Sequence, residues 1–179
     1  MELNLYVFYV GGMLPGRKIE NHDIVFAIGQ TVEDCYDQIK DQCSDFSGLH
    51  IDSYTLYDGI FGLRVDIVDS KLAINNANDE SLYLCYIGVE SPGSFVEKHI
   101  LSTSKGKSAS EVKAKMKAYF SNEEYWQSDG VLDSDRKSMH VDNMIKLESP
   151  SLDFTLVLVP DSTYDNRRPS NIAKYIPLS

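Results

Sequence analysis

The feature that most constrains this chain is an internal repeat. Sliding the 179-residue sequence along itself by 77 positions places Leu5 to Gly11 over Leu82 to Gly88, with aromatic and aliphatic residues in phase. Ten of the thirty-six pairs that this shift forms from residue 5 to residue 40 are identical, and most of them are aromatic, Gly, Pro, His or Glu. A repeat of this length indicates one supersecondary unit present twice.

The repeat continues through a predicted helix in each copy. Thr31 to Asp34 and Ser108 to Glu111 both place an acid three residues after a hydroxyl, which is the pattern of a capped helix N-terminus. Apolar residues then recur at helical spacing in both copies. Past the helices the shift grows from 77 to 90, so that Leu49 to Asp52 falls on Met139 to Asp142, and the inserted residues lie at about 122–138.

Each copy therefore reads as strand, long loop, strand, helix, strand, strand. We expect an α+β fold in which two tandem modules form mixed sheets and are related by a pseudo-twofold, as in a homodimer of single modules. The expected boundaries are 1–69 for the first module, 70–81 for a polar linker, 82–159 for the second module and 160–179 for a C-terminal tail. The tail either is mobile or docks through Ile172, Tyr175 and Ile176.

Composition and charge exclude several classes of protein. A formal net charge of -10 and a pI near 4.7 disfavour nucleic acid as a partner, because such binders display a basic face. The apolar runs are strand-sized, so we predict neither a membrane span nor a secretory signal, and a cytoplasmic location. The three cysteines form no CxxC pair, which favours reduced, buried thiols: Cys35, Cys43 and Cys85.

The recurring polar residues are the candidate functional positions, and they include every histidine of the chain. Side chains alternate across a strand, so Glu20 and His22 should share one face, as should His50 and Asp52. A crossover through the helix should leave the two strands parallel, with both pairs near the same end of the sheet. The same argument brings together the second set, Glu97, His99, His140 and Asp142.

Three readings of these residues remain open. Imidazoles and carboxylates could bind a divalent metal, with His22, His50, Asp52, His99, His140 and Asp142 as candidate ligands. Without metal, Glu20, His22, His50 and Asp52 could act as a catalytic acid-base set, in which a carboxylate fixes the imidazole tautomer. Structurally, the histidines could pin the long loop 11–19 by hydrogen bonds.

Other motifs are read as structural. Pro15-Gly16 is a turn former, because Pro presets one dihedral and Gly permits a positive φ. Gly11-Gly12 is not a phosphate loop, since a strand and not a helix is predicted after it. The recurring strand tyrosines are most simply packing residues, although their phenols could line a pocket: Tyr6, Tyr9, Tyr83 and Tyr86.

The motif Tyr9-Val-Gly-Gly12, Pro15-Gly16, Glu20-Asn-His22-Asp23 and Leu49-His-Ile-Asp-Ser53 resembles the bacterial domain-of-unknown-function family DUF1543. The resemblance is close from about Leu5 to Ser53 and looser in the second copy. It implies a fold unit, found singly or in tandem, and implies no activity. The second copy departs from the motif at Val89, Ile100 and Asn143, so the first is the better candidate for an intact site.

The leading functional expectation is a non-enzymatic cytosolic binding or interaction module, with a pocket near the histidine and carboxylate ends of the sheets. The alternatives are a metal-dependent or acid-base enzyme that uses the same cluster, and a structural assembly subunit. A divalent metal is the candidate cofactor. A protein partner or a second copy of the chain is the candidate macromolecular partner.

Overall fold

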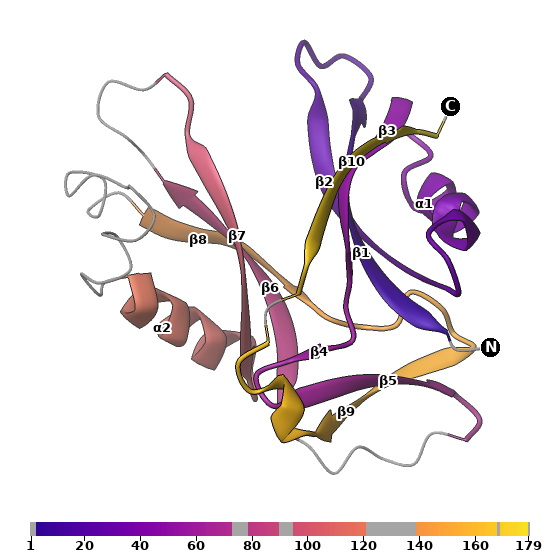
Figure 1. The fold of residues 1–179 in the computed structure, drawn as a ribbon. Coiled ribbons are helices and arrows are strands. Elements are labelled where there is room, and N and C mark those ends of the chain that lie inside the picture. Colours follow the sequence, from indigo (N-terminus) through magenta and orange to yellow (C-terminus); the bar gives the residue numbers. More distant parts are fainter. Residues whose placement is uncertain (1–2, 73–78, 90–94, 121–138, 168, 179) are drawn as a thin grey trace. The chain divides into compact units, whose positions relative to one another are not determined.

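The computed structural model describes residues 3–72, 79–89, 95–120, 139–167 and 169–178. The chain divides into two compact units (Figure 1). Unit 1 contains residues 1–76 and 148–179, and unit 2 contains residues 77–147. Outside the described residues lie the expected insertion at about 122–138, half of the 70–81 linker, and Pro92-Gly93, which the shift of 77 places on Pro15-Gly16.

The main sheet of unit 1 has the strand order β10-β3-β1-β2. Its strands are β1 (Asn4–Met13), β2 (Asn21–Gly29), β3 (Ser47–Leu56) and β10 (Asn171–Pro177). Both β2 and β3 pair antiparallel with β1, so they run parallel to each other with β1 between them. The expected α+β class is correct, but the expected mixed pairing is wrong: every strand pairing described is antiparallel, because the crossover passes over β1.

Alternation along β1 decides which side chains form the core of unit 1. Tyr6, Phe8 and Val10 pack in one cluster with Cys35 and Ile39 from the helical segment. That segment is a 3-10 turn (Glu33–Cys35) followed by α1 (Tyr36–Gln42). The intervening β1 residues, and with them Gly11, therefore face away from the helix.

The C-terminal tail docks. Strand β10 pairs antiparallel with β3, and the Leu178 N–H donates to the Leu49 carbonyl at 2.9 Å. Leu178 is buried in the core cluster, and Ile176 packs against it. Of the two fates expected for this segment, the structure shows an edge strand of the main sheet.

A second sheet of unit 1 joins segments that are far apart in the sequence. Its strands are β4 (Gly59–Ile60), β5 (Leu63–Asp69) and β9 (Phe154–Pro160), in the order β4-β5-β9. Strands β5 and β9 pair antiparallel from Leu63 with Pro160 to Asp69 with Phe154. The last strand of the second sequence copy thus lies in unit 1, next to the last strand of the first copy. A 3-10 turn (Ser162–Tyr164) follows it.

Unit 2 is a three-stranded antiparallel sheet with one helix. Strands β6 (Ser81–Val89), β7 (Lys98–Gly106) and β8 (Met139–Lys146) lie in the order β7-β6-β8, and α2 spans Ala109–Phe120. The nine residue pairs of β6 with β7 are the nine pairs of β1 with β2 moved by 77 positions. The core consists of Tyr83, Cys85, Ile87, Val112, Met116 and Phe120.

Local signals read from the sequence have their expected structural effects. The Thr31 hydroxyl accepts from the Asp34 N–H at 3.4 Å, and the Asp34 carboxylate accepts from the Thr31 N–H at 2.8 Å. Ser108 and Glu111 make the matching cap of α2, with Glu111 accepting from the Lys107 N–H.

The expected turn also forms. The Arg17 N–H donates to the Leu14 carbonyl, with φ of 77° at Gly16, as a type II turn requires.

The cysteines are buried and reduced, as the sequence predicted. Burial raises the pKa of the Cys35 thiol to about 12 and that of the Cys85 thiol to about 11, so neither is an activated nucleophile. Among the described residues no helix has the length and apolar character needed to cross a membrane.

Candidate functional site

The candidate site of unit 1 is centred on Gly11 of β1. His22 on β2 and His50 on β3 are both the direct cross-strand partners of Gly11, so the two imidazoles stand on either side of a residue without a side chain. A Cβ at Gly11 would lie 2.6 Å from His50 Nε2 and 3.2 Å from Asp52 Oδ2. The absence of a side chain here leaves the space into which the polar groups of both neighbouring strands point.

A β-bulge brings Asp52 into this space. Val10 pairs with Ile51 but Tyr9 pairs with Ser53, so Asp52 is an extra residue in β3 without its own partner on β1. Bulges of this kind bend the strand and redirect a side chain. Asp52 therefore joins His50 on the face that bears Gly11. Glu20, which directly precedes β2, supplies the second carboxylate.

The four side chains converge on one point. Nε2 of His22 lies 3.6 Å from Glu20 Oε2 and 3.2 Å from Asp52 Oδ2. Nε2 of His50 lies 3.3 Å from Glu20 Oε1 and 3.4 Å from Asp52 Oδ1. Each carboxylate thus directs one oxygen at each imidazole. The sequence prediction that Glu20, His22, His50 and Asp52 lie together agrees with this geometry.

Two contacts and burial hold the His50 ring in place. Its Nδ1 is 2.9 Å from the Gly48 carbonyl oxygen, and because a carbonyl only accepts, Nδ1 carries the proton. Tyr175 of β10 packs on the ring with centroids 4.6 Å apart, and the side chain is only 7% exposed. The contact at Nδ1 leaves Nε2 as the nitrogen that faces the carboxylates. A second contact of this type is common for metal-binding histidines, because it sets the tautomer and the ring orientation.

His22 is held by an aromatic ring. Tyr9 stacks on it with a centroid distance of 4.9 Å and an interplanar angle of 3°. The strand tyrosine read as a packing residue therefore packs against a site residue. The stack fixes the plane of the imidazole and leaves its Nε2 edge pointing at the two carboxylates.

The hydrogen bonds within the site do not balance the negative charge of its two carboxylates. If Nε2 of His50 carries no proton, its lone pair faces two carboxylate oxygens, which is repulsive. Asp52 Oδ2 is buried and has no hydrogen-bond partner among the described residues, although His22 Nε2 is close to it. Leaving a buried carboxylate oxygen unsatisfied costs roughly 1–3 kcal/mol or more. Positive charge is therefore required at the centre, from protons on the rings or from a bound cation.

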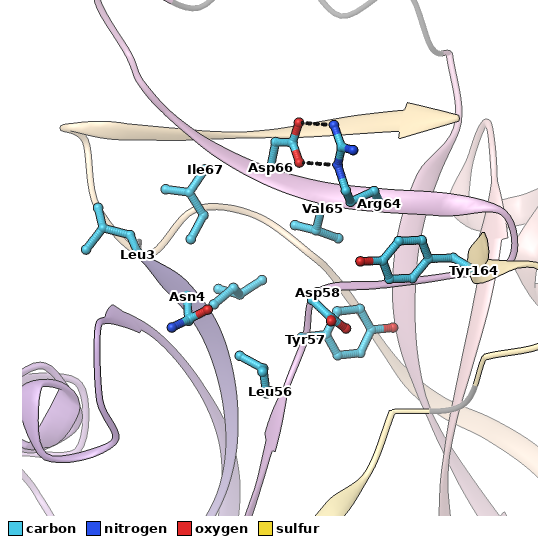
Figure 2. Close-up of a pocket in the computed structure, with 11 residues that line it drawn as sticks. Leu3, Asn4, Leu56, Tyr57, Asp58, Arg64, Val65, Asp66, Ile67 and Tyr164 are labelled. Carbon is cyan, nitrogen blue, oxygen red and sulfur yellow. Dashed lines mark hydrogen bonds and ion pairs between the residues drawn. The ribbon is translucent and has the colours of Figure 1, made fainter. Parts of the chain in front are cut away.

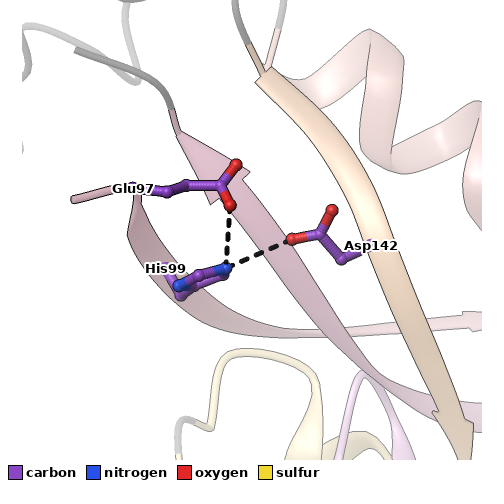
Figure 3. A group of neighbouring side chains, drawn as sticks. All are labelled: Glu97, His99 and Asp142. Carbon is purple, nitrogen blue, oxygen red and sulfur yellow. Dashed lines mark ion pairs between the residues drawn. The ribbon is translucent and has the colours of Figure 1, made fainter. Parts of the chain in front are cut away.

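Unit 2 repeats this arrangement, and Figure 3 shows three of its four residues, Glu97, His99 and Asp142. His99 and His140 both pair with Gly88, and the register of β6 with β8 shifts at Asp142 as that of β1 with β3 shifts at Asp52. His99 Nε2 lies 3.3 Å from Glu97 Oε2 and 3.4 Å from Asp142 Oδ2. His140 Nε2 lies 3.2 Å from Glu97 Oε1 and 2.8 Å from Asp142 Oδ1.

The supporting contacts of unit 2 match those of unit 1 only in part. Tyr86 stacks on His99 with centroids 4.5 Å apart, as Tyr9 does on His22. Glu97 Oε1 is buried without a hydrogen-bond partner among the described residues, so this site too has an unsatisfied carboxylate oxygen. His140, however, is 51% exposed, whereas its counterpart His50 is buried. Strand β8 has no further strand on its outer edge among the described residues, where β3 has β10.

The donor set suits a divalent transition metal. Two imidazole nitrogens with two carboxylates are ligands that zinc, manganese and iron accept. The ligand atoms of Glu97, His99 and Asp142 all lie within 4.8 Å of one another, a spread that one ion can bridge. The unsatisfied oxygens and the space at each glycine also fit a metal ion. A cation in that space would fill it and satisfy the oxygens together.

A cleft in unit 1 is the other candidate site, and it is the weaker one. It has a volume of about 510 Å³ and is lined in part by Asp58, Arg64, Asp66 and Tyr164 (Figure 2). Its charged groups already pair internally. Arg64 makes two hydrogen bonds to Asp66, at 2.7 and 2.9 Å, which raise the pKa of the guanidinium, and Asp58 pairs with Arg167 at 2.7 Å.

Three contributors to the site were missed or misread in the sequence. Gly11 is assigned no role in the site from the sequence, although its recurrence as Gly88 is a signal for one. Tyr175 was expected only as a docking residue of the tail. The role of the Gly48 carbonyl had no sequence signal, since any residue supplies a carbonyl.

The comparisons with known proteins agree with the fold and leave the chemistry open. The family model of DUF1543, a domain of unknown function, matches residues 17–67. The crystal structure of a protein Il1583 from Idiomarina loihiensis is similar over 99% of both chains, with a TM-score of 0.67 and 23% sequence identity. At that identity the likeness establishes the fold alone. No curated protein is similar to this chain.

Proposed function

We propose that the chain binds one divalent transition-metal ion in each unit. The DUF1543 model that matches residues 17–67 describes a domain of unknown function, so the activity is argued from the site. The protein is then a binding module whose ligand is a metal ion. Glu20, His22, His50 and Asp52 bind the ion of unit 1. The ligands in unit 2 are Glu97, His99, His140 and Asp142.

One observation carries this proposal: in both units two Nε2 atoms and two carboxylates converge beside a glycine, at separations of 2.8 to 3.6 Å. The purely structural reading needs the histidines only as hydrogen-bond donors that pin a loop. In that reading protonated rings would satisfy the buried oxygens one contact at a time, Asp52 Oδ2 through His22 and Glu97 Oε1 through His140, each at 3.2 Å. A cation at the centre satisfies both.

We also propose that the chain is a tandem duplication of one module, with the two modules related by a pseudo-twofold. The common registers of the two main sheets support this, as does the common bulge at Asp52 and Asp142. The β5–β9 ladder supports it too. Under the shift of 90, Leu156 and Val157 are the counterparts of Asp66 and Ile67. Asp66 pairs with Val157 and Ile67 pairs with Leu156, which is the reciprocal pairing that a twofold axis produces.

The test of metal binding is equilibrium dialysis of the full chain, purified without a histidine tag and stripped with EDTA. Dialysis against Zn²⁺, Mn²⁺ or Fe²⁺, with the metal content measured by mass spectrometry, should give two ions per chain for at least one of these metals. The variant Glu20→Gln/Asp52→Asn should bind one ion, and Glu97→Gln/Asp142→Asn should also bind one.

Asp41→Asn is the matched control, because it removes a carboxylate from the exposed side of α1 and should leave two ions bound. An ion at about a hundred times its dissociation constant should also stabilise the protein by roughly 2.7 kcal/mol. Absence of saturable binding for all three metals, together with a melting temperature that EDTA does not change, would rule out the proposal.

A further inference from the structure

The two candidate sites have the same ligands but different surroundings, and the difference is concentrated in one residue of each. His22 and His99 have side-chain exposures of 32% each, and both stack on a strand tyrosine. Asp52 and Asp142 are similarly exposed, at 32% and 27%. Only the histidines of the third strands differ strongly, since His50 is 7% exposed and His140 is 51% exposed.

The burial of His50 is due to the C-terminal strand. Pro177 is its cross-strand partner, and Tyr175 packs on its ring at 4.6 Å between centroids. The backbone beyond the ring is also fixed, because the Leu178 N–H donates to Leu49, next to His50. His50 can leave the site only if β10 separates from β3.

Within the described part of unit 2, no strand or aromatic ring restrains His140 in this way. Its strand β8 is an edge strand of its sheet in the described part of unit 2, and its ring is half exposed to solvent. Rotation about its side-chain torsions moves Nε2 away from Glu97 and Asp142 without disturbing any described backbone pairing. A ligand that can rotate away lets an ion dissociate in steps, whereas a fixed ligand keeps the ion in place.

We propose, on the basis of the metal binding argued above, that the two sites have different functions: the unit 1 site retains its ion, and the unit 2 site exchanges its ion with the surroundings. Strand β10, through the Tyr175 ring, causes the difference in ion release between the two sites. The Tyr175 contact orients a ligand ring from outside the ligand set, and the loss of such a contact typically changes metal affinity about ten- to a hundredfold.

The exposed side of the unit 2 site determines which kind of molecule can take up its metal ion. An incoming chelator reaches the ion from the side of His140 and takes its place as a ligand. We therefore expect unit 2 to exchange its ion with a small-molecule chelator. Unit 1 is shielded on the corresponding side by Tyr175.

The experiment uses the full chain loaded with two Co²⁺ ions, whose absorption reports bound metal, and mixed rapidly with excess EDTA. We expect two phases of loss, the slow one about ten- to a hundredfold slower than the fast one. Glu97→Gln/Asp142→Asn should remove the fast phase, and Glu20→Gln/Asp52→Asn should remove the slow phase. A slow phase that belongs to unit 2, or a single rate for both ions, overturns the inference.

The role of β10 is tested by Tyr175→Ala, which should accelerate the slow phase towards the fast one. Tyr175→Phe should keep the slow phase, because the contact is made by the ring. Ile172→Ala is the matched control: it lies on β10 opposite Tyr54, away from His50, and should leave both rates unchanged. An unchanged slow phase in Tyr175→Ala, with circular dichroism matching the wild type, would overturn the role of β10.

The two proposals fail in different ways. If Co²⁺ does not bind at all, metal binding is wrong and the difference between the sites falls with it. If two ions bind and leave at the same rate, metal binding holds and only the division of roles is wrong.

Discussion

The two units contain the same four polar residues in the same register, yet they place them in different environments. In unit 1 the third-strand histidine is oriented by a backbone carbonyl and packed against an aromatic ring of a fourth strand. In unit 2 the corresponding histidine is half exposed. The comparison shows that a donor set alone does not determine the behaviour of a site, because the neighbouring strand decides how firmly each ligand is held.

The largest expected effect comes from adding one methyl group to the centre of each site. In Gly11→Ala the new Cβ would lie 2.6 Å from Nε2 of His50. Because that ring is fixed, either the ring or the backbone of β1 must shift. We expect loss of the unit 1 ion and a destabilisation of about 1–3 kcal/mol from overpacking. Urea unfolding and metal analysis measure the two effects.

Gly88→Ala sharpens this comparison. Its new Cβ would meet the ends of the Glu97 and Asp142 side chains, which have room to turn. We expect loss of the unit 2 ion with a destabilisation below about 1 kcal/mol. Equal destabilisation by the two variants would show that the His50 ring is no more rigidly held than the carboxylates of unit 2.

The histidines themselves give the next largest difference, measured in metal-free protein. His50→Ala removes a buried ring together with its hydrogen bond to Gly48, and should destabilise the fold by roughly 1–3 kcal/mol. His140→Ala removes a half-exposed ring and should change stability by no more than about 0.5 kcal/mol. Chemical denaturation in EDTA measures both, and a reversed order of the two effects would contradict the comparison.

The smallest difference between the two units is expected at the helix caps, where we expect the units to behave alike. Thr31→Ala and Ser108→Ala each remove one side-chain acceptor from a helix start and should cost about 0.5–2 kcal/mol. Far-UV circular dichroism during thermal unfolding measures the loss. A cap effect confined to one unit would show that the helices differ in ways that their hydrogen bonds do not.

The stabilisation from these caps depends on pH, because each cap contains a carboxylate. Hydrogen bonds from Thr31 hold the pKa of Asp34 below its usual value, and a hydrogen bond from Lys115 does the same for Glu111. A lowered folded-state pKa stabilises the protein above the unfolded-state pKa, near 4, and the stabilisation is lost as the pH falls. Urea unfolding should therefore show Asp34→Asn to be destabilising at pH 7 and less destabilising at pH 3.

Much of the candidate site could be predicted from the sequence. The spacing of Glu20 with His22 and of His50 with Asp52 predicts each pair on one face, because side chains alternate along a strand, and the bulge at Asp52 keeps its carboxylate on that face. The crossover through the helix then brings both pairs to the same end of the sheet. Both arguments depend on chain geometry that nearby residues determine, which is why they succeed.

The rest depends on contacts between distant segments. Nothing near Tyr175 indicates that its ring packs on His50, 125 positions earlier in the sequence, and no local pattern pairs β5 with β9. The bulge at Asp52 is likewise set by the partner strand. The expectation of mixed sheets failed for a related reason, since the sequence shows a crossover but not which strand it passes over.

The pairing of β5 with β9 also has a consequence for biosynthesis, since unit 2 is interposed between the two segments of unit 1. During translation, residues 77–147 emerge from the ribosome before β9 and β10 exist, so unit 2 has all its strands while β3 and β5 still lack partners on one edge. Open edges of that kind promote aggregation of nascent chains. The first half of this protein is therefore the part that a chaperone would have to protect, until synthesis reaches the end of β10.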